Sequence, residues 1–155
     1  YGGIAVCILS ILYSFIYSVN TALLFLNDSR DLAKKWIEKN IAKDDDIGYF
    51  SYEIYLPAIS EKKNMRSINA MRQPQIDFND FEEWFMRKPF EYILLSDLFY
   101  KRFINSEKYV RRAQFYKNLI KEKLGYKIVK IFKYKSVLNP SIDFVNPKLI
   151  LLKRE

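Results

Sequence analysis

The sequence predicts an α/β protein in which an N-terminal transmembrane helix precedes a small soluble domain. Residues 4–26 are apolar or uncharged, and the first charged side chain of the chain is Asp28. The rest alternates between short β-branched or aromatic runs and segments with apolar residues at helical spacing, a pattern typical of α/β domains. We therefore expect a transmembrane helix over residues 1–27 and a soluble domain over residues 28–155. That domain should contain a mixed sheet of about four strands in two or three layers.

The apolar segment is long enough to cross a bilayer. At ~1.5 Å per residue it extends roughly 35 Å, whereas the hydrocarbon core of a bilayer is ~30 Å thick. A signal peptide would have a basic start and a shorter apolar core, yet no Lys or Arg precedes Arg30. A buried helix of a soluble protein would usually be shorter and amphipathic. A transmembrane helix is therefore the favoured interpretation.

Small residues recur along one face of this helix. At intervals of four they are Gly2, Ser10, Ser14, Ser18 and Ala22, with Val6 between the first two. Small side chains let a second helix approach closely, so we expect Ser10, Ser14, Ser18 and Ala22 to pack against another transmembrane helix. The alternative is an accidental row, because Ser and Ala are common in membrane helices. Since the sequence begins with Tyr1 instead of Met, we also expect a fragment whose helix is the last span of a multispan protein.

Two helices and two strands are expected in the first part of the soluble domain. They are a helix from about Ser29 to Lys39, a strand from Ile47 to Phe50 that can extend to Ile54, a helix from about Asn79 to Met86, and a strand from Tyr92 to Ser96. The polar stretch from Ser60 to Gln75 yields no prediction. Because the first helix follows the membrane span almost directly, the domain should be pinned to the lipid surface. The continuous apolar run of the second strand predicts a central strand covered on both faces.

One helix and two strands are expected in the second part. The helix should begin at Asn105 or Ser106 and end at Leu124, with Gly125 adopting the left-handed conformation that stops it. The strands cover residues 127–134 and 148–153. We expect the first two strands of the domain to be parallel and the last two to form an antiparallel pair at one side of the sheet.

The charge of the domain is unevenly distributed. Residues 28–100 carry 11 basic and 14 acidic side chains, whereas residues 101–155 carry 15 basic and 4 acidic ones. A basic half favours anionic partners such as lipid headgroups or phosphates. Lys130, Lys133 and Lys135, which alternate with aromatic residues, are candidates for contact with headgroups. Such alternation can also bind single-stranded nucleic acid by stacking and charge. On a strand it is explained more simply by one apolar and one solvated face, so that face is the alternative interpretation and nucleic acid is not an expected partner.

Several kinds of catalytic site are not expected in this sequence. It contains no His, which excludes His-based zinc sites and Ser-His-Asp triads, and its one cysteine, Cys7, excludes an intrachain disulfide. Its four glycines form no phosphate-binding fingerprint. The acidic residues Asp77, Asp80, Glu82 and Glu83 flank aromatic residues of a packing face, and residues 44–46 suit a solvated turn. We therefore assign no catalytic residue, cofactor site or metal site.

The sequence nevertheless resembles the C-terminal end of prokaryotic multispan glycosyltransferases of the GT-C type, which include protein-mannosyltransferase-like and aminoarabinose-transferase-like enzymes. In such proteins an Asp-x-Arg-x-x-Ala-x-x-Trp-Ile segment follows the final span, and here it is formed by Asp28, Arg30, Ala33, Trp36 and Ile37. The segments that carry the resemblance are DSRDLAKKWIEKNI (28–41), IGYFSYE (47–53), PFEYILLSDLFYKRF (89–103), AQFYKNLIKEKLGYKIVKIF (113–132) and NPKLILLKR (146–154).

The resemblance implies a function for an intact protein, namely transfer of a sugar from a polyprenyl-phosphate donor. It places the soluble domain on the extracytoplasmic side of the cell membrane. The expected partners are upstream transmembrane helices of the same protein and membrane lipid or lipid-linked sugar. The family's catalytic acidic residue lies in an early loop, so no catalytic residue is carried over. The competing hypothesis is a membrane-tethered, non-catalytic module that binds an anionic ligand or lipid headgroup.

Overall fold

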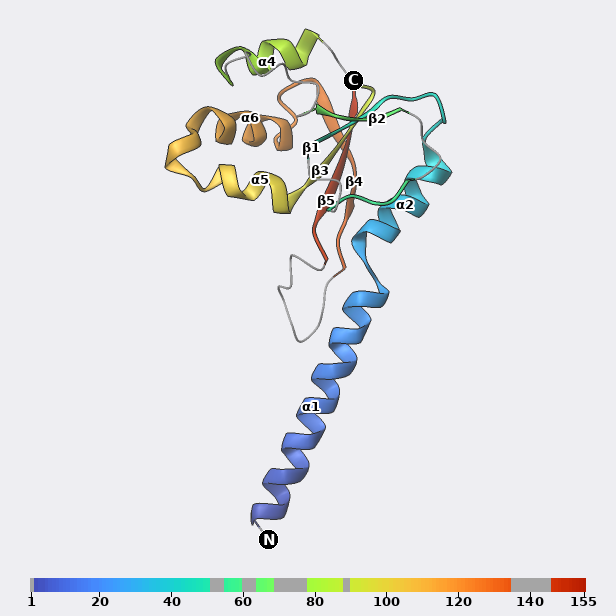
Figure 1. Ribbon diagram of the computed structural model, residues 1–155, viewed down its shortest axis with the longest axis vertical. Coiled ribbons are helices and arrows are strands. Elements are labelled where there is room, and N and C mark those ends of the chain that lie inside the picture. The colour runs from blue at the N-terminus through green and yellow to red at the C-terminus, as the bar shows by residue number, and fades with distance from the viewer. Residues whose placement is uncertain (1, 51–54, 60–63, 69–77, 88–89, 135–145) are drawn as a thin grey trace.

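The computed structural model describes residues 2–50, 55–59, 64–68, 78–87, 90–134 and 146–155. Figure 1 shows a long N-terminal helix that leads into a domain of helices and strands. The helices are α1 (Gly2–Leu26), α2 (Ser29–Asn40), α4 (Phe78–Arg87), α5 (Asp97–Ile104), the short 3-10 helix η2 (Glu107–Tyr109) and α6 (Val110–Ile120). The strands are β1 (Ile47–Phe50), β2 (Met65–Ser67), β3 (Tyr92–Ser96), β4 (Tyr126–Phe132) and β5 (Leu149–Arg154).

The strands form one mixed sheet in the order β2-β1-β3-β5-β4. β1 is parallel to both β2 and β3, whereas β5 is antiparallel to β3 and β4. The α/β class, the parallel first pair and the antiparallel pair at one side are therefore confirmed. The described sheet has five strands instead of about four, because β2 lies within the polar stretch for which no strand was predicted.

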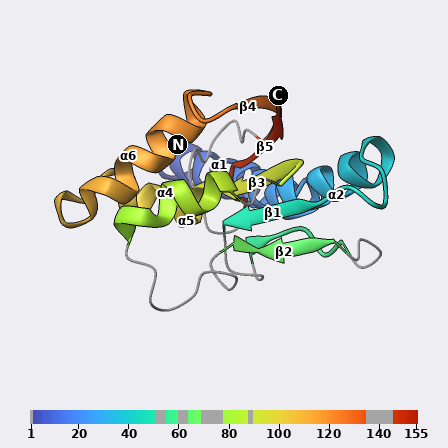
Figure 2. The ribbon, with the colours of Figure 1, turned by 90° about the horizontal axis from the view of Figure 1, so that it is seen from above.

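Helices cover both faces of this sheet, as the view from above shows (Figure 2). On one face, Ala33 and Ile37 of α2 pack with Tyr49, Leu94 and Leu151. On the other face the sheet packs against aromatic residues of α4, α5 and α6, and the sheet contributes the buried side chains Phe50, Ile93, Leu95, Ile150 and Leu152. All five residues of β3 are buried, which confirms the expectation of a central strand covered on both sides.

The predicted helix from residue 105 or 106 to Leu124 is shorter in the structure. Regular α-helix begins at Val110, after η2, and ends at Ile120. The residue that stops the helix is Glu122, whose φ is +59°. The Glu122 N–H donates to Leu119 O at 3.1 Å, and the Lys123 N–H donates to Asn118 O at 2.9 Å. These two bonds form a Schellman motif, which usually places glycine at this position. Gly125, with φ +71°, instead turns the chain into β4.

Other boundaries agree closely with the sequence-based expectations. α2 was expected from Ser29 to Lys39 and extends one residue further at its C-terminal end. α4 was expected from Asn79 to Met86 and extends one residue further at each end. α5 was not predicted, although three of its aromatic residues are buried: Phe99, Tyr100 and Phe103. The proposed extension of the first strand to Ile54 lies outside the described residues.

Candidate functional site

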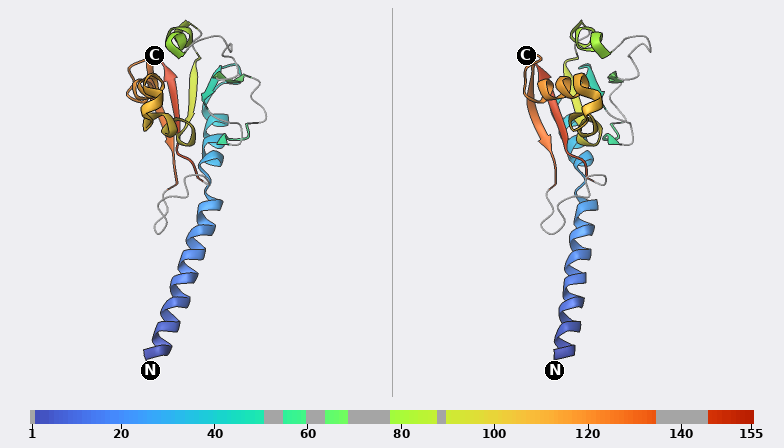
Figure 3. Two further views of the ribbon diagram at one scale, coloured as in Figure 1. Left: turned by 60° about the vertical axis from the view of Figure 1, so that its left-hand side comes forward. Right: turned by 90° about the vertical axis from the view of Figure 1, so that its left-hand side faces the viewer.

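The long helix α1 exposes its apolar side chains along most of its length. Its 25 residues extend roughly 37 Å, and within it only Asn20 and Leu24, near the domain, are buried. Ile11 is 70% and Phe15 is 65% exposed. Figure 3 shows α1 projecting away from the domain in two further views. In the part of the chain that the structure describes, this is the one helix long and apolar enough to cross a membrane.

The small-residue face of α1 is open. Ser10, Ser14, Ser18 and Ala22 are all exposed. Each serine hydroxyl donates to the carbonyl oxygen four residues earlier, at 2.9, 2.8 and 2.8 Å in chain order. The hydroxyls are thus satisfied within the helix and would not leave a polar group unpaired in lipid. The predicted packing role of these four residues stays a prediction, since the structure contains one chain.

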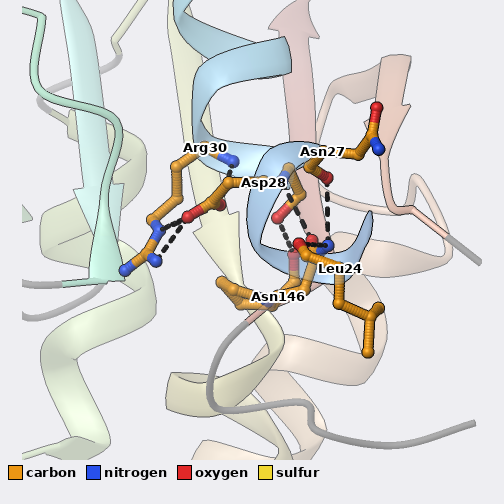
Figure 4. A network of polar contacts seen from close by, with 7 residues as sticks. Leu24, Asn27, Asp28, Arg30 and Asn146 are labelled. Atoms are coloured by element: carbon orange, nitrogen blue, oxygen red, sulfur yellow. Dashed lines mark hydrogen bonds and ion pairs between the residues drawn. The ribbon is translucent and has the colours of Figure 1, made fainter. Parts of the chain in front are cut away.

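The junction between α1 and α2 is held by a buried amide. Asn146, only 4% exposed, donates from Nδ2 to Leu24 O at 3.3 Å and to Asn27 O at 3.0 Å, and its Oδ1 accepts the Ser29 N–H at 2.9 Å. The Ser29 hydroxyl donates to Pro147 O nearby. These five residues are called the joint below. They satisfy backbone groups that the ends of both helices would otherwise leave unpaired, and they fix how α1 leaves the domain (Figure 4).

Asp28 and Arg30 reinforce the start of α2 beside the joint, as Figure 4 shows. Asp28 is the N-cap residue, and its Oδ1 accepts the Arg30 N–H at 2.8 Å. The Arg30 Nε also donates to both oxygens of this carboxylate, at 3.0 and 2.8 Å. The hydrogen bond with Asp28 raises the pKa of Arg30.

A buried carboxylate ties the segment after the joint to the central strand. Asp97, whose side chain is fully buried, follows β3 directly and accepts the Lys148 N–H on Oδ1 at 2.9 Å. Its own N–H donates to Lys148 O at 3.0 Å, and Lys101 Nζ lies 2.8 Å from its Oδ2. The start of β5 is therefore attached both to the end of α1 and to the end of β3. We assign Asp97 a structural role on these contacts.

The lysines predicted to contact headgroups lie on or beyond the edge strand β4. Lys130 and Lys133 are exposed, and Lys135 lies outside the described residues. Lys133 follows Phe132, which pairs with Leu149 at the start of β5, so Lys133 lies at the same end of the sheet as the joint. Lys130 pairs further along β5, with Leu151. The structure thus brings one of the two described lysines toward the exit of α1.

A basic and aromatic cluster was missed by the sequence analysis. The Arg102 guanidinium lies 4.3 Å from the centre of the Phe99 ring and 4.8 Å from that of Phe103, and Arg112 lies 5.3 Å from Phe103. Lys108 and Arg112 each lie 5.6 Å from the Tyr109 ring centre. Basic and aromatic residues also alternate in the sequence between residues 99 and 112, as they do between residues 127 and 135.

The candidate acidic residues form no site among the described residues. Glu82 and Glu83 are exposed on α4, Asp77 is outside the described residues, and nothing is described of the Asp80 side chain. Within the described part of the chain, no group of three metal-ligating side chains is found.

No protein-family model, curated protein or solved structure matches this chain. The likeness to GT-C glycosyltransferases therefore depends on the spaced residues of the sequence, and the site must be interpreted from its own geometry.

Proposed function

We propose that the chain is a membrane-anchored module whose α/β domain is held at the lipid surface by α1. The observation that carries the proposal is an exposed apolar helix that continues directly into a hydrogen-bonded joint. Leaving a large apolar side chain in water instead of burying it costs about 1.5–3 kcal/mol, so such a surface is stable only against hydrocarbon or protein. The length of α1 suits a bilayer core of ~30 Å.

We further propose that this module is the C-terminal part of an integral membrane glycosyltransferase that uses a polyprenyl-phosphate sugar donor. The support is the sequence pattern after the span, in which Asp28 and Arg30 are also the residues that cap and stabilise α2. In this proposal the domain lies on the extracytoplasmic side, and the catalytic residues lie in upstream parts of the protein. The small-residue face of α1 packs against upstream transmembrane helices.

Extraction of membranes from cells expressing the full chain tests the anchor. The chain should remain in the pellet after alkaline carbonate treatment. The variant Ile11→Lys/Phe15→Lys should be released, because each charge at the centre of a bilayer costs ~2.5–3.5 kcal/mol on insertion scales. Leu32→Lys, which places a charge on an exposed position of α2, is the matched control and should stay in the pellet. Recovery of the unmodified chain as a soluble monomer without detergent would contradict the anchor.

Sugar transfer tests the enzyme assignment separately. The full chain in liposomes with a polyprenyl-phosphate sugar should be inactive alone and active when the gene's upstream region is co-expressed. Turnover by the chain alone would contradict the placement of catalytic residues elsewhere. A start codon directly before the Tyr1 codon would contradict the assignment to a multispan protein.

The second candidate function is a membrane-tethered module that binds anionic headgroups through β4. The observation that favours it is the position of Lys133 at the joint end of the sheet. In uncharged detergent micelles, addition of phosphatidylglycerol should shift the backbone NMR signals of Lys130 and Lys133, and salt should reverse the shifts. Signals that do not respond to the anionic lipid would exclude this function.

A further inference from the structure

The turn between α5 and α6 gathers basic side chains around aromatic rings, of which Phe103 is buried and Tyr109 is exposed. We propose that this turn, which we call the hairpin tip (Arg102, Phe103, Lys108, Tyr109, Arg111 and Arg112), binds the phosphate group of a phosphorylated ligand. The proposal concerns a surface separate from the joint and from the β4 lysines. It does not depend on whether α1 spans a membrane.

The aromatic rings provide a fixed base for the cations. Phe103, which is buried, stacks on Tyr116 with ring centres 5.7 Å apart and meets Tyr109 edge-on at 5.6 Å. The guanidinium groups of Arg102 and Arg112 both lie about 5 Å from the centre of the Phe103 ring. Stacking on an aromatic face restricts a guanidinium group, so less conformational entropy is lost when it binds a ligand.

A hollow lies beside these cations. It has a volume of about 310 Å³, and its lining consists of Lys108, Tyr109, Val110, Arg111 and Arg112. Tyr109 is 39% and Val110 is 67% exposed, so the hollow is open to solvent and to a ligand of modest size. This volume is at the lower end of small-molecule sites, ~300–1,000 Å³, and suits a phosphate with a small attached group.

The electrostatics at the tip favour an anion. Arg111 and Arg112 occupy the first turn of α6, which contains no acidic residue. The preceding 3-10 helix contains Glu107, so residues 102–112 carry four basic side chains and one acidic one. Cations are unfavourable at a helix N-terminus, because the helix dipole is positive there. A bound anion would offset both the charge of the arginines and the positive end of the dipole. Burial raises the pKa of the nearby Tyr116, and the charges of Arg112 and Arg102 act against that rise.

The chemistry of the donors selects phosphate. Guanidinium groups bind phosphate oxygens in bidentate fashion, and a lysine ammonium adds a compact charge. A phosphate monoester carries nearly two negative charges and three acceptor oxygens, enough for several cations at once. The diester phosphate of a lipid headgroup carries one negative charge shared by two oxygens, which a bidentate guanidinium group can also bind. The source of the phosphate is either a soluble phosphorylated ligand or the headgroup of a lipid, and these two sources can be distinguished by experiment.

The test uses the full chain, labelled with ¹⁵N, in uncharged detergent micelles. One arm titrates inorganic pyrophosphate, and the other adds phosphatidylglycerol to the micelles. In at least one arm the amide signals of Tyr109 and Val110 should shift saturably. The variant Lys108→Gln/Arg111→Gln, at two exposed positions, should weaken that binding by about tenfold or more, since charge-assisted contacts are the strong ones. Lys130→Gln/Lys133→Gln removes the same charge from the β4 surface and should change the dissociation constant by less than about twofold.

Each outcome decides a point. Saturation by pyrophosphate identifies a soluble phosphorylated ligand, and saturation by phosphatidylglycerol alone identifies a lipid headgroup. No saturable shift in either arm overturns the proposal. Equal losses in the two double variants also overturn it, because binding would then follow net charge and not the hairpin tip. A loss confined to Lys130→Gln/Lys133→Gln would overturn it in favour of the β4 surface.

Discussion

Asn146 joins parts of the chain that are far apart in sequence. Its three hydrogen bonds reach residues between 117 and 122 positions earlier, at the end of α1 and the start of α2. A buried amide with three such bonds is expensive to remove, because its former partners lose their bonds without gaining water. At the scale of single residues, the stability of the joint therefore depends mainly on this side chain.

Replacing Asn146 by Ala should lower the free energy of unfolding by roughly 1–3 kcal/mol per buried group left unpaired. Urea unfolding of the full chain in micelles, followed by the fluorescence of Trp36 and Trp84, measures the change. Asn40→Ala is the matched control, because Asn40 is exposed and its Nδ2 bonds Trp36 O at 2.7 Å on the surface of α2. Equal effects of the two substitutions would contradict the role of the joint.

The residues of the joint were predictable only in part. Asp28 lies in the run Asn27-Asp28-Ser29, whose residue types favour the start of a helix, and it does cap α2. Asn146, by contrast, is followed by Pro147, and the pattern Asn-Pro indicates only a break in regular structure. Sequence spacing reports which residues share a helix face or a strand face, and it carries no information about a partner more than a hundred residues away. The residues of the hairpin tip, by contrast, are close together in sequence and alternate basic with aromatic side chains, but which cation lies over which ring is set by the packing of α5 against α6.

At the scale of elements, β1 depends on the absence of a side chain at Gly48. A Cβ there would lie 2.7 Å from Phe90 Cγ and 2.8 Å from Ile68 Cδ1, both in the packed core. Gly48 therefore allows Phe90, in the segment before β3, and Ile68, directly after β2, to pack against the sheet.

Gly48→Ala should destabilise the domain by about 1–3 kcal/mol, the usual cost of overpacking a well-filled core. Thermal unfolding in micelles, monitored by near-ultraviolet circular dichroism, gives the magnitude. Gly3→Ala adds the same methyl group to α1 at a position with nothing within 4 Å and should leave the domain transition unchanged. A Gly48→Ala domain as stable as the original would show that Phe90 and Ile68 can move away without cost.

Elements with a strong local pattern were predictable, and those formed through neighbours were not. The apolar runs of β3 and β5 and the helical spacing of α2 identify them from sequence alone. β2 has three residues with Arg66 at its centre, and it forms because β1 offers an edge and Asp46 pairs with Arg66 at 2.7 Å. α5 begins immediately after β3, without the intervening turn signals that usually announce a helix.

For the whole molecule, the joint should make α1 and the domain move as one body. The single cysteine, Cys7, is exposed on α1 and provides a natural site for a spin label. A second label at Lys121→Cys, an exposed position after α6, should give a narrow distribution of distances to Cys7 in micelles. Adding Asn146→Ala should broaden that distribution, whereas Asn40→Ala should not. Equal widths of the distance distribution in the Asn146→Ala and Asn40→Ala variants would mean that the packing of α2 alone fixes the orientation of α1.

The position of β5 has a consequence for how the protein is made. The strand β5, Leu149–Arg154, lies between β3 and β4, so an inner strand of the sheet follows the other four described strands in the sequence. While residues 149–154 of a nascent polypeptide are still inside the ribosomal exit tunnel, that strand is missing, and so β4 cannot yet be joined to β3. The apolar helix leaves the ribosome more than a hundred codons earlier. A stop codon introduced just before the Leu149 codon would therefore remove an inner strand of the sheet and separate β4 from β3.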